Sequence, residues 1–218
     1  MTTDAKCGRI PVSIRRSPLL RQGGFAVVDG LLYDLLFRSL VEEAVSRCGE
    51  AVESFAETSD DELWRGGSPA RRFLSVSGGE VQDAMYHAPG MGRVLADLCG
   101  FVVRPTGGRG TFTYYARPGD YLAIHRDVHQ CDLAVITCLR ETHPNTASGK
   151  LAVYPGRTSE TLQTLRATPA KGCRPLPLHP GQTALLLGGI VPHQVLPVVA
   201  GQVRIASILC YEISGAAS

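Results

Sequence analysis

The chain has 218 residues with a formal net charge of +2 at neutral pH, and 44% of them are hydrophobic. This length and composition are typical of one globular domain with a sizeable core. The nearly balanced charge does not indicate a nucleic acid or an anionic membrane as a partner, and no apolar run approaches the length of a membrane span.

Residues 1–22 are basic and contain two prolines, so we expect an arm or a lid there, followed by a single domain over residues 23–218. The segment 24–32 is typical of a short strand that leads into a helix. That helix is predicted over residues 33–52, where leucines and valines recur at helical spacing and form one apolar face.

Residues 54–80 are polar and rich in glycine and serine. They predict a long excursion, and such excursions are often lids or substrate loops.

A second helix is expected near residues 91–99, where Gly100 would end it. From Thr111 onward, strand-like runs alternate with turn signals, which favours a sandwich or a barrel. Helices first and strands after predict an α+β fold, with N-terminal helices buttressing one sheet.

The seven cysteines do not have the pattern of a disulfide framework or a zinc ribbon, because their number is odd and no two form a C-x-x-C pair. Cys131, Cys138 and Cys210 each lie inside an apolar run and are predicted to be small core residues. The N-terminus lacks a hydrophobic stretch long enough for a signal peptide, so a reducing cytoplasm is the expected location.

The sequence His125-Arg126-Asp127 contains the first half of a candidate metal site. Residues i and i+2 of a strand face the same side, so His125 and Asp127 would project together into the barrel, with Tyr121 and Ala123 on the same face. An H-x-D pattern occurs often by chance, and an ordinary surface or core histidine is the alternative interpretation.

His193 is the candidate for a third metal ligand. It follows Pro192 and opens an apolar strand. Two histidines and one carboxylate on one face of an octahedral metal leave three positions open. Non-haem Fe(II) oxygenases use this coordination to bind a co-substrate and O2 together.

Arg204 lies in a later apolar strand, where a cation is costly to bury unless an anion meets it. A guanidinium binds a carboxylate through two parallel hydrogen bonds, so we expect Arg204 to hold the far carboxylate of a dicarboxylate co-substrate. A surface arginine or a structural ion pair is the alternative. A cupin-like binding protein or a zinc hydrolase would need no buried arginine opposite the metal.

Together these motifs resemble the 2-oxoglutarate/Fe(II)-dependent dioxygenase superfamily, in its compact prolyl-hydroxylase-like branch. The resemblance extends over residues 24–30 and 111–213. It is carried by H-R-D at 125–127, G-K-L-A-V-Y-P at 149–155, G-x-T-A-L-L-L-G at 181–188 and H-Q-V-L-P-V-x-x-G-x-V-R at 193–204.

This resemblance implies a double-stranded β-helix core, also called a jelly roll, which cupins share. It implies that Fe(II) is held by a facial triad of His125, Asp127 and His193, and that Arg204 binds the C5 carboxylate of 2-oxoglutarate. Tyr115 is implied as a further 2-oxoglutarate contact, with Tyr114 as its rival. O2 would be the second co-substrate.

Two features depart from the branch, and a third narrows the reaction. The branch commonly has a lysine where this chain has Arg204, and Ala206 stands where some relatives have a hydroxyl, with Ser207 next. Both departures weigh against a peptidyl proline as substrate. Halogenating relatives lack a carboxylate at the position of Asp127, so hydroxylation or desaturation is favoured over halogenation.

The expected reaction is hydroxylation, desaturation or cyclisation at an unactivated C–H bond of a small molecule, such as an amino acid or a related metabolite of specialised biosynthesis. A peptidyl or protein hydroxylase and a cupin-like binding protein are the alternatives. No nucleic-acid or membrane partner is expected, and the oligomeric state is left open. Candidate substrate contacts, each of which could instead be an ordinary solvated or packing residue, are Arg117, Arg126, His129 and Trp64.

Overall fold

The computed structural model describes residues 14–60 and 64–216. Most of the predicted N-terminal arm, residues 1–13, lies outside the described residues. In the remainder of that segment, Ile14 and Leu19 are buried. Leu19 belongs to the short helix α1 (Pro18–Arg21), whose first turn is capped by the Ser17 hydroxyl. A lid role for the arm stays a prediction.

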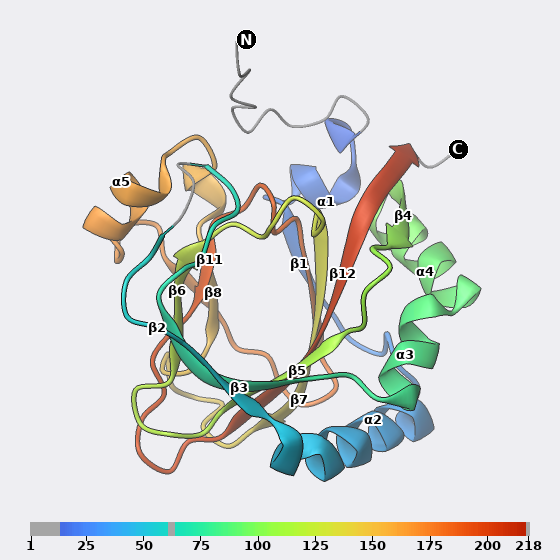
Figure 1. Cartoon of the computed structure of the whole chain (residues 1–218). Coiled ribbons are helices and arrows are strands. Elements are labelled where there is room, and N and C mark those ends of the chain that lie inside the picture. The colour runs from blue at the N-terminus through green and yellow to red at the C-terminus, as the bar shows by residue number, and fades with distance from the viewer. Residues whose placement is uncertain (1–13, 61–63, 217–218) are drawn as a thin grey trace, which may run out of the picture.

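One curled antiparallel sheet forms the body of the molecule (Figure 1). Its strands follow the order β1-β10-β7-β12-β5-β3-β6-β11-β8-β9, while β2 pairs with β3 and β4 pairs with β12. The strands are β1 (Phe25–Val28), β2 (Val52–Ala56), β3 (Arg71–Ser77), β4 (Phe101–Pro105), β5 (Thr111–Tyr115), β6 (Tyr121–His125), β7 (Leu133–Glu141), β8 (Leu151–Val153), β9 (Arg174–Leu176), β10 (Thr183–Leu186), β11 (His193–Val195) and β12 (Arg204–Ala216).

Three helices cover one outer flank of the sheet (Figure 1): α2 (Asp34–Ser46), α3 (Glu80–His87) and α4 (Pro89–Cys99). The carboxylate of Glu43 in α2 accepts hydrogen bonds from the backbone N–H groups of Val81 and Gln82, which caps the start of α3. Gly100 ends α4 with a left-handed φ of 79°, as expected of a helix-terminating glycine.

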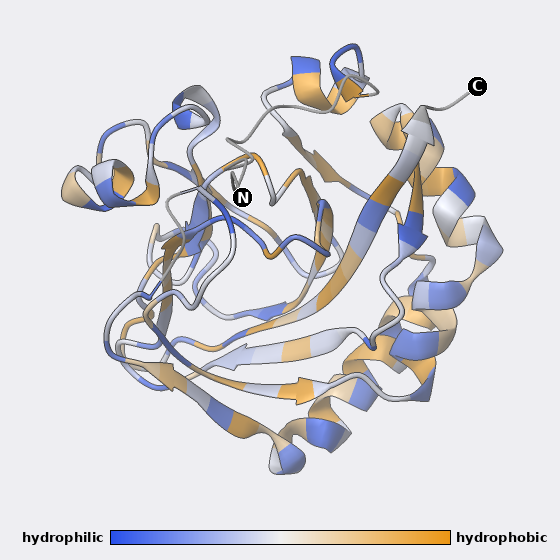
Figure 2. Cartoon of the chain, turned by 45° about the horizontal axis from the view of Figure 1, so that its top comes forward, coloured by the Kyte–Doolittle hydropathy of each residue, from blue (hydrophilic) through white to orange (hydrophobic). Residues whose placement is uncertain are grey.

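The remaining helical pieces are α5 (Leu162–Ala167) and the 3-10 turns η2 (Arg47–Glu50) and η3 (Pro155–Arg157). α5 packs Leu162 and Leu165 against Ile124 of β6 and Tyr154. Figure 2 shows hydropathy changing from residue to residue along strands and helices, as expected where one face of each element is buried. None of the described helices is long and apolar enough to cross a membrane.

The predicted α+β jelly roll is confirmed, but the interpretation of residues 54–80 is wrong in part. This stretch contains most of β2 and all of β3, and β3 also pairs with β5 and β6. Residues 57–60 and 64–70 contain no helix or strand except an isolated bridge between Asp60 and Ser68, and these described residues are called the 57–70 loop below. Likewise, the helix predicted over 33–52 ends at Ser46 and gives way to η2. The serines and arginines of β3 hid its strand character because they interrupt its apolar residues.

The structure contradicts the interpretation of two cysteines as plain core residues. Cys131 and Cys210 form a disulfide with an S–S distance of 2.11 Å, although they are 79 positions apart. Cys138 is buried and free, as predicted. The pairing escaped prediction because it depends on the packing of the loop after β6 against β12, which no cysteine spacing reveals.

Candidate functional site

His125, Asp127 and His193 meet at the end of β6. His125 closes β6, Asp127 follows two residues later, and His193 opens the neighbouring strand β11, with His125 as its Cα partner. Their potential ligand atoms all lie within 4.8 Å of one another. Asp127 Oδ1 is 3.6 Å from His125 Nε2 and 3.5 Å from His193 Nε2.

Backbone carbonyls fix the orientation of both imidazoles. His125 Nδ1 lies 2.9 Å from the carbonyl of Ala123, and His193 Nδ1 lies 3.0 Å from that of Val191. A carbonyl can only accept, so each Nδ1 carries a proton, and in the neutral form of the ring each Nε2 presents a lone pair. This is the tautomer in which histidine binds a metal through Nε2.

Only one of the two carboxylate oxygens of Asp127, Oδ1, has polar partners among the described residues. The Oδ2 atom is buried and has no hydrogen-bond partner among the described residues. Although burial opposes ionisation, the two imidazoles hold the pKa of Asp127 well below its usual range. Burial and His193 lower the pKa of His125. Burial also lowers the pKa of His193, but the nearby Asp127 carboxylate has the larger effect, so the pKa of His193 is raised overall.

An unsatisfied buried oxygen such as Oδ2 is costly, and the other oxygen of the same carboxylate, Oδ1, lies 3.6 Å from His125 Nε2 and 3.5 Å from His193 Nε2. This donor set fits a divalent transition-metal ion, which would take one ligand atom from each residue.

Gly188 makes room for that carboxylate. The Asp127 N–H donates to the Gly188 carbonyl at 2.9 Å, which holds the two backbones together. A Cβ atom at position 188 would lie 1.8 Å from Asp127 Oδ2. Glycine is therefore required by space at this position, which explains the glycine that ends the apolar run of β10.

Arg65, in the 57–70 loop, clamps the loop that follows Asp127. Its guanidinium donates to the carbonyls of Asp127 at 2.8 Å, Val128 at 2.7 Å and Cys131 at 3.0 Å, and to the Asp132 carboxylate at 2.9 Å. Sequence reasoning missed this residue. No local signal distinguishes an arginine in a polar loop from a solvated one, since its partners lie more than 60 positions away.

Arg204 lies on the interior side of the barrel without a counter-ion. It begins β12, its Cα partner is Tyr115 of β5, and it is only 3% exposed. Its guanidinium makes no hydrogen bond or ion pair with any described residue and lies 5.4 Å from the centroid of the Tyr115 ring. A buried, unpaired cation is expensive, so this side chain is suited to receive an anion.

The two neighbouring tyrosines face opposite sides of β5. Tyr114 points to the helices and donates to the Ala44 carbonyl at 2.7 Å. Tyr115 packs with Phe73, Val195 and Val198, and its hydroxyl makes no hydrogen bond with any described residue. Burial raises the pKa of Tyr115, so it stays a neutral hydroxyl that can donate a hydrogen bond. Tyr115 therefore faces Arg204, and Tyr114 does not.

A bulge in β6 changes which residues accompany His125. Val195 pairs with Leu122, while His193 pairs with His125, so one extra residue is accommodated on β6. Leu122, rather than Tyr121, packs with Tyr115 and Val195. Strict alternation predicted that Tyr121 would lie on the same face as His125. This prediction is wrong because the bulge shifts the alternation of side chains by one residue.

Arg126 is not available to a substrate. Its guanidinium donates to the carbonyls of Trp64, Thr158, Glu160 and Ile190 at 2.9–3.0 Å. Burial lowers its pKa to about 10. Arg126 joins three loops instead of lining the mouth, because it is only 4% exposed and four of its five N–H donors are bound to backbone carbonyls.

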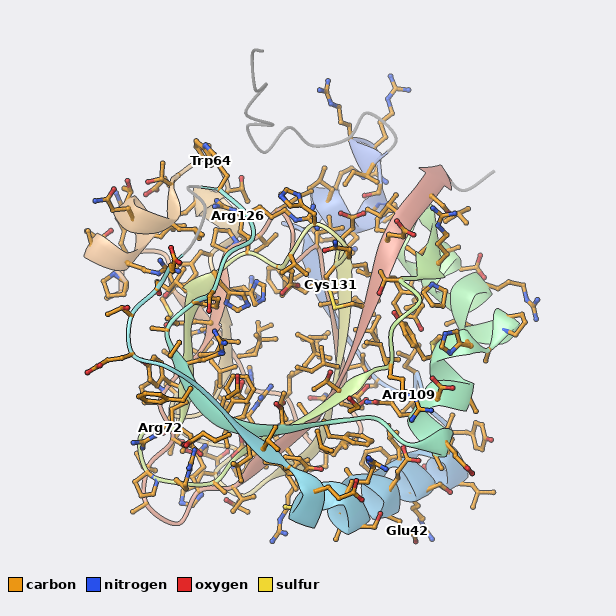
Figure 3. All side chains as sticks on the ribbon, viewed as in Figure 1. Glu42, Trp64, Arg72, Arg109, Arg126 and Cys131 are labelled. Atoms are coloured by element: carbon orange, nitrogen blue, oxygen red, sulfur yellow. A yellow bond between two sulfur atoms is a disulfide. The ribbon has the colours of Figure 1, made fainter. Side chains whose placement is uncertain are left out.

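The other substrate candidates occupy different positions. Arg117 lies in the turn before β6, at the opposite end of that strand from His125, and pairs with Glu53 and Asp120. Trp64 is half-buried beside Arg126, and Figure 3 shows the two side chains close together at the upper left of the view. His129 is exposed in the loop after Asp127. Trp64 and His129 stay candidates, whereas Arg117 lies beyond the end of β6 that is opposite the metal-ligand candidates.

Three solved structures share this architecture. A Pseudomonas putida prolyl-4-hydroxylase is 20% identical, with a TM-score of 0.57 over 90% of this chain and 96% of that chain. AviO1 from Streptomyces viridochromogenes Tue57 is 18% identical, with a TM-score of 0.63 over 89% and 92%. SnoN, a non-haem alpha-ketoglutarate-dependent epimerase from nogalamycin biosynthesis, is 16% identical, with a TM-score of 0.61 over 88% and 78%.

No family model and no curated protein matches the sequence. At identities of 20% or less, the structural similarity establishes the fold. The predicted double-stranded β-helix fold is thereby confirmed.

Proposed function

We propose that this chain is an Fe(II)- and 2-oxoglutarate-dependent oxygenase. His125, Asp127 and His193 would hold the metal, while Arg204 and Tyr115 would hold 2-oxoglutarate. The observation that carries the proposal is the presence of two incomplete sites in one barrel. One is a three-ligand set with an orphaned carboxylate oxygen, and the other is a buried guanidinium without a counter-ion.

The proposed roles of Arg204 and Tyr115 follow from their lack of a counter-ion and of a hydrogen-bond partner, respectively, among the described residues. Arg204 would bind the distal carboxylate of 2-oxoglutarate through two parallel hydrogen bonds, and the Tyr115 hydroxyl would donate a third. Phe73, Val195 and Val198 would pack beside Tyr115 and exclude water from this end of the co-substrate. When bound, Fe(II) with 2-oxoglutarate and O2 would supply the oxidising power for C–H cleavage, which no side chain provides.

Arg204 also separates this proposal from the non-oxygenase alternatives. A cupin-like binding protein or a zinc hydrolase could use the same three ligands, but neither requires a buried arginine that lacks an anion. A facial arrangement of two histidines and one carboxylate, with a separate anion site, is the pattern expected for a metal that binds a chelating diacid.

For the substrate, we propose a small molecule, such as an amino acid or a related metabolite, which would be hydroxylated, desaturated or cyclised. The 57–70 loop supports this, because Arg65 and the Trp64 carbonyl tie it to Asp127 and Arg126, and a loop held beside the metal ligands would leave less room for an extended peptide. The structural similarity to the prolyl-4-hydroxylase favours a peptide as the second candidate. Because Arg126 is buried and bound to four backbone carbonyls, we expect another group to recognise any substrate carboxylate.

The test is succinate release from 2-oxoglutarate with Fe(II) in air, screened over amino acids, other metabolites and proline-containing peptides. We expect one compound class to stimulate turnover, His193→Ala to abolish it and His179→Ala, at an exposed histidine, to leave it unchanged. Succinate release that survives in His193→Ala at the wild-type rate would contradict the proposed ligand set.

A further inference from the structure

A buried acid lies opposite Arg204. Glu141 ends β7 and is the Cα partner of Arg204 across the β7–β12 ladder. Side chains directly opposite on antiparallel strands have Cβ atoms about 4.5–5.5 Å apart, close enough for an ion pair. The Glu141 side chain is only 2% exposed, yet it makes no ion pair with Arg204.

Lys150 engages this acid instead. Lys150 directly precedes β8, and its Nζ lies 2.9 Å from Glu141 Oε2 and 2.9 Å from the His143 carbonyl. The other oxygen, Glu141 Oε1, accepts hydrogen bonds from the His143 N–H and from Gln202 Nε2. Burial raises the pKa of Glu141, but these donors hold it below its usual value, and Lys150 has the largest effect among them. Both Glu141 oxygens are thus occupied.

Arg204, Glu141 and Lys150 form one group of charges, because Arg204 and Glu141 are opposite each other in the ladder and Lys150 is paired with Glu141. Cys138 faces Ala206 in the ladder, and Arg204, Glu141 and Lys150 are all close enough to influence its thiol. Two cations and one anion leave the group with one uncompensated positive charge. One further carboxylate would balance it, and Arg204 is the member with unused donors.

We propose that Lys150 is a positioning residue for the co-substrate, because its bond to Glu141 keeps Arg204 free to bind a carboxylate. This inference rests on the proposed function of Arg204. Without the Lys150 ammonium, Glu141 would be a buried charge lacking its main partner, and Arg204 is the cation opposite it. The diacid would then compete with Glu141, and its apparent affinity would fall with the fraction of molecules in which Arg204 is free.

The experiment measures 2-oxoglutarate binding without turnover, by anaerobic equilibrium dialysis of the Mn(II)-loaded protein. Lys150→Met is expected to weaken 2-oxoglutarate binding on the order of tenfold while the Mn(II) affinity is unchanged. The double variant Lys150→Met/Glu141→Gln is expected to restore binding to within about twofold of wild type, because no acid is left to compete. Arg104→Met, which breaks an exposed ion pair with Glu212, is the matched control.

Other outcomes would contradict either this inference or the proposed function. Equal weakening in Lys150→Met and in the double variant would mean that Lys150 contacts the diacid itself or only supports the fold, and the inference would be wrong. Unchanged binding in Lys150→Met would also overturn it. If Lys150→Met does not fold, Lys150→Gln, which keeps a donor but no charge, is compared with Lys150→Gln/Glu141→Gln by the same criterion. Failure of the wild-type protein to bind 2-oxoglutarate would instead contradict the proposed function.

Discussion

At the scale of single residues, the Asp127 carboxylate depends on the missing side chain of Gly188. In Gly188→Ala, the new methyl group would occupy the place of Asp127 Oδ2, and the backbone hydrogen bond between the two residues prevents them from separating. We expect the affinity for Mn(II) to fall by about 10- to 100-fold, as when a group that orients a metal ligand is removed. Equilibrium dialysis measures this affinity.

Gly156→Ala is the matched control, because a Cβ atom at that position would meet no atom within 4 Å. The control should bind Mn(II) as the wild-type protein does. Wild-type affinity in Gly188→Ala as well would show that the Asp127 carboxylate is not a ligand in its observed orientation.

At the scale of elements, Arg65 joins the 57–70 loop to the loop after Asp127 through three carbonyls and one carboxylate. Arg65→Met removes all four bonds and leaves the Asp132 carboxylate without its guanidinium. We expect the Asp127 backbone to move and the Mn(II) affinity to fall on the order of tenfold, whereas 2-oxoglutarate analogues that bind without metal, such as glutarate, should bind unchanged.

Arg109→Met serves as the control for Arg65, since Arg109 is exposed in a different loop (Figure 3). A loss of glutarate binding in parallel with Mn(II) binding would indicate general unfolding rather than displacement of one ligand. Retention of full Mn(II) affinity in Arg65→Met would show that the clamp does not position Asp127.

At the scale of the whole molecule, the Cys131–Cys210 disulfide joins the loop after Asp127 to β12. It closes a loop of 79 positions, so Cys131→Ser should lower the free energy of unfolding by about 2–5 kcal/mol under oxidising conditions. Chemical denaturation measures this change, and a reducing agent should remove the difference from wild type.

Cys48→Ser is the control for the disulfide, because Cys48 is an exposed free thiol. It should leave the unfolding free energy unchanged in both redox conditions. Thiol counting on the denatured, unreduced protein provides an independent check. Detection of Cys131 and Cys210 as free thiols after air oxidation would contradict the pairing.

The resemblance of its motifs to a known family implied the jelly roll, while the sequence pattern by itself predicted an α+β fold with a sandwich or barrel and indicated His125, Asp127, His193 and Arg204 as site candidates. It could do so because alternation along a strand and the order of short apolar runs are local properties, which the chain carries in any context. The placement of three of these residues within 4.8 Å of one another agrees with that pattern.

Only the tertiary structure decided the other features. The bulge in β6, the choice of Tyr115 over Tyr114, the Arg65 clamp and the engagement of Arg126 by carbonyls all depend on contacts between segments far apart in the chain. The same holds for the disulfide and for the choice of Lys150 over Arg204 as partner of Glu141. Such contacts are selected by which backbone atoms and charges the folded chain brings within hydrogen-bond distance, and local periodicity contains no information about that distance.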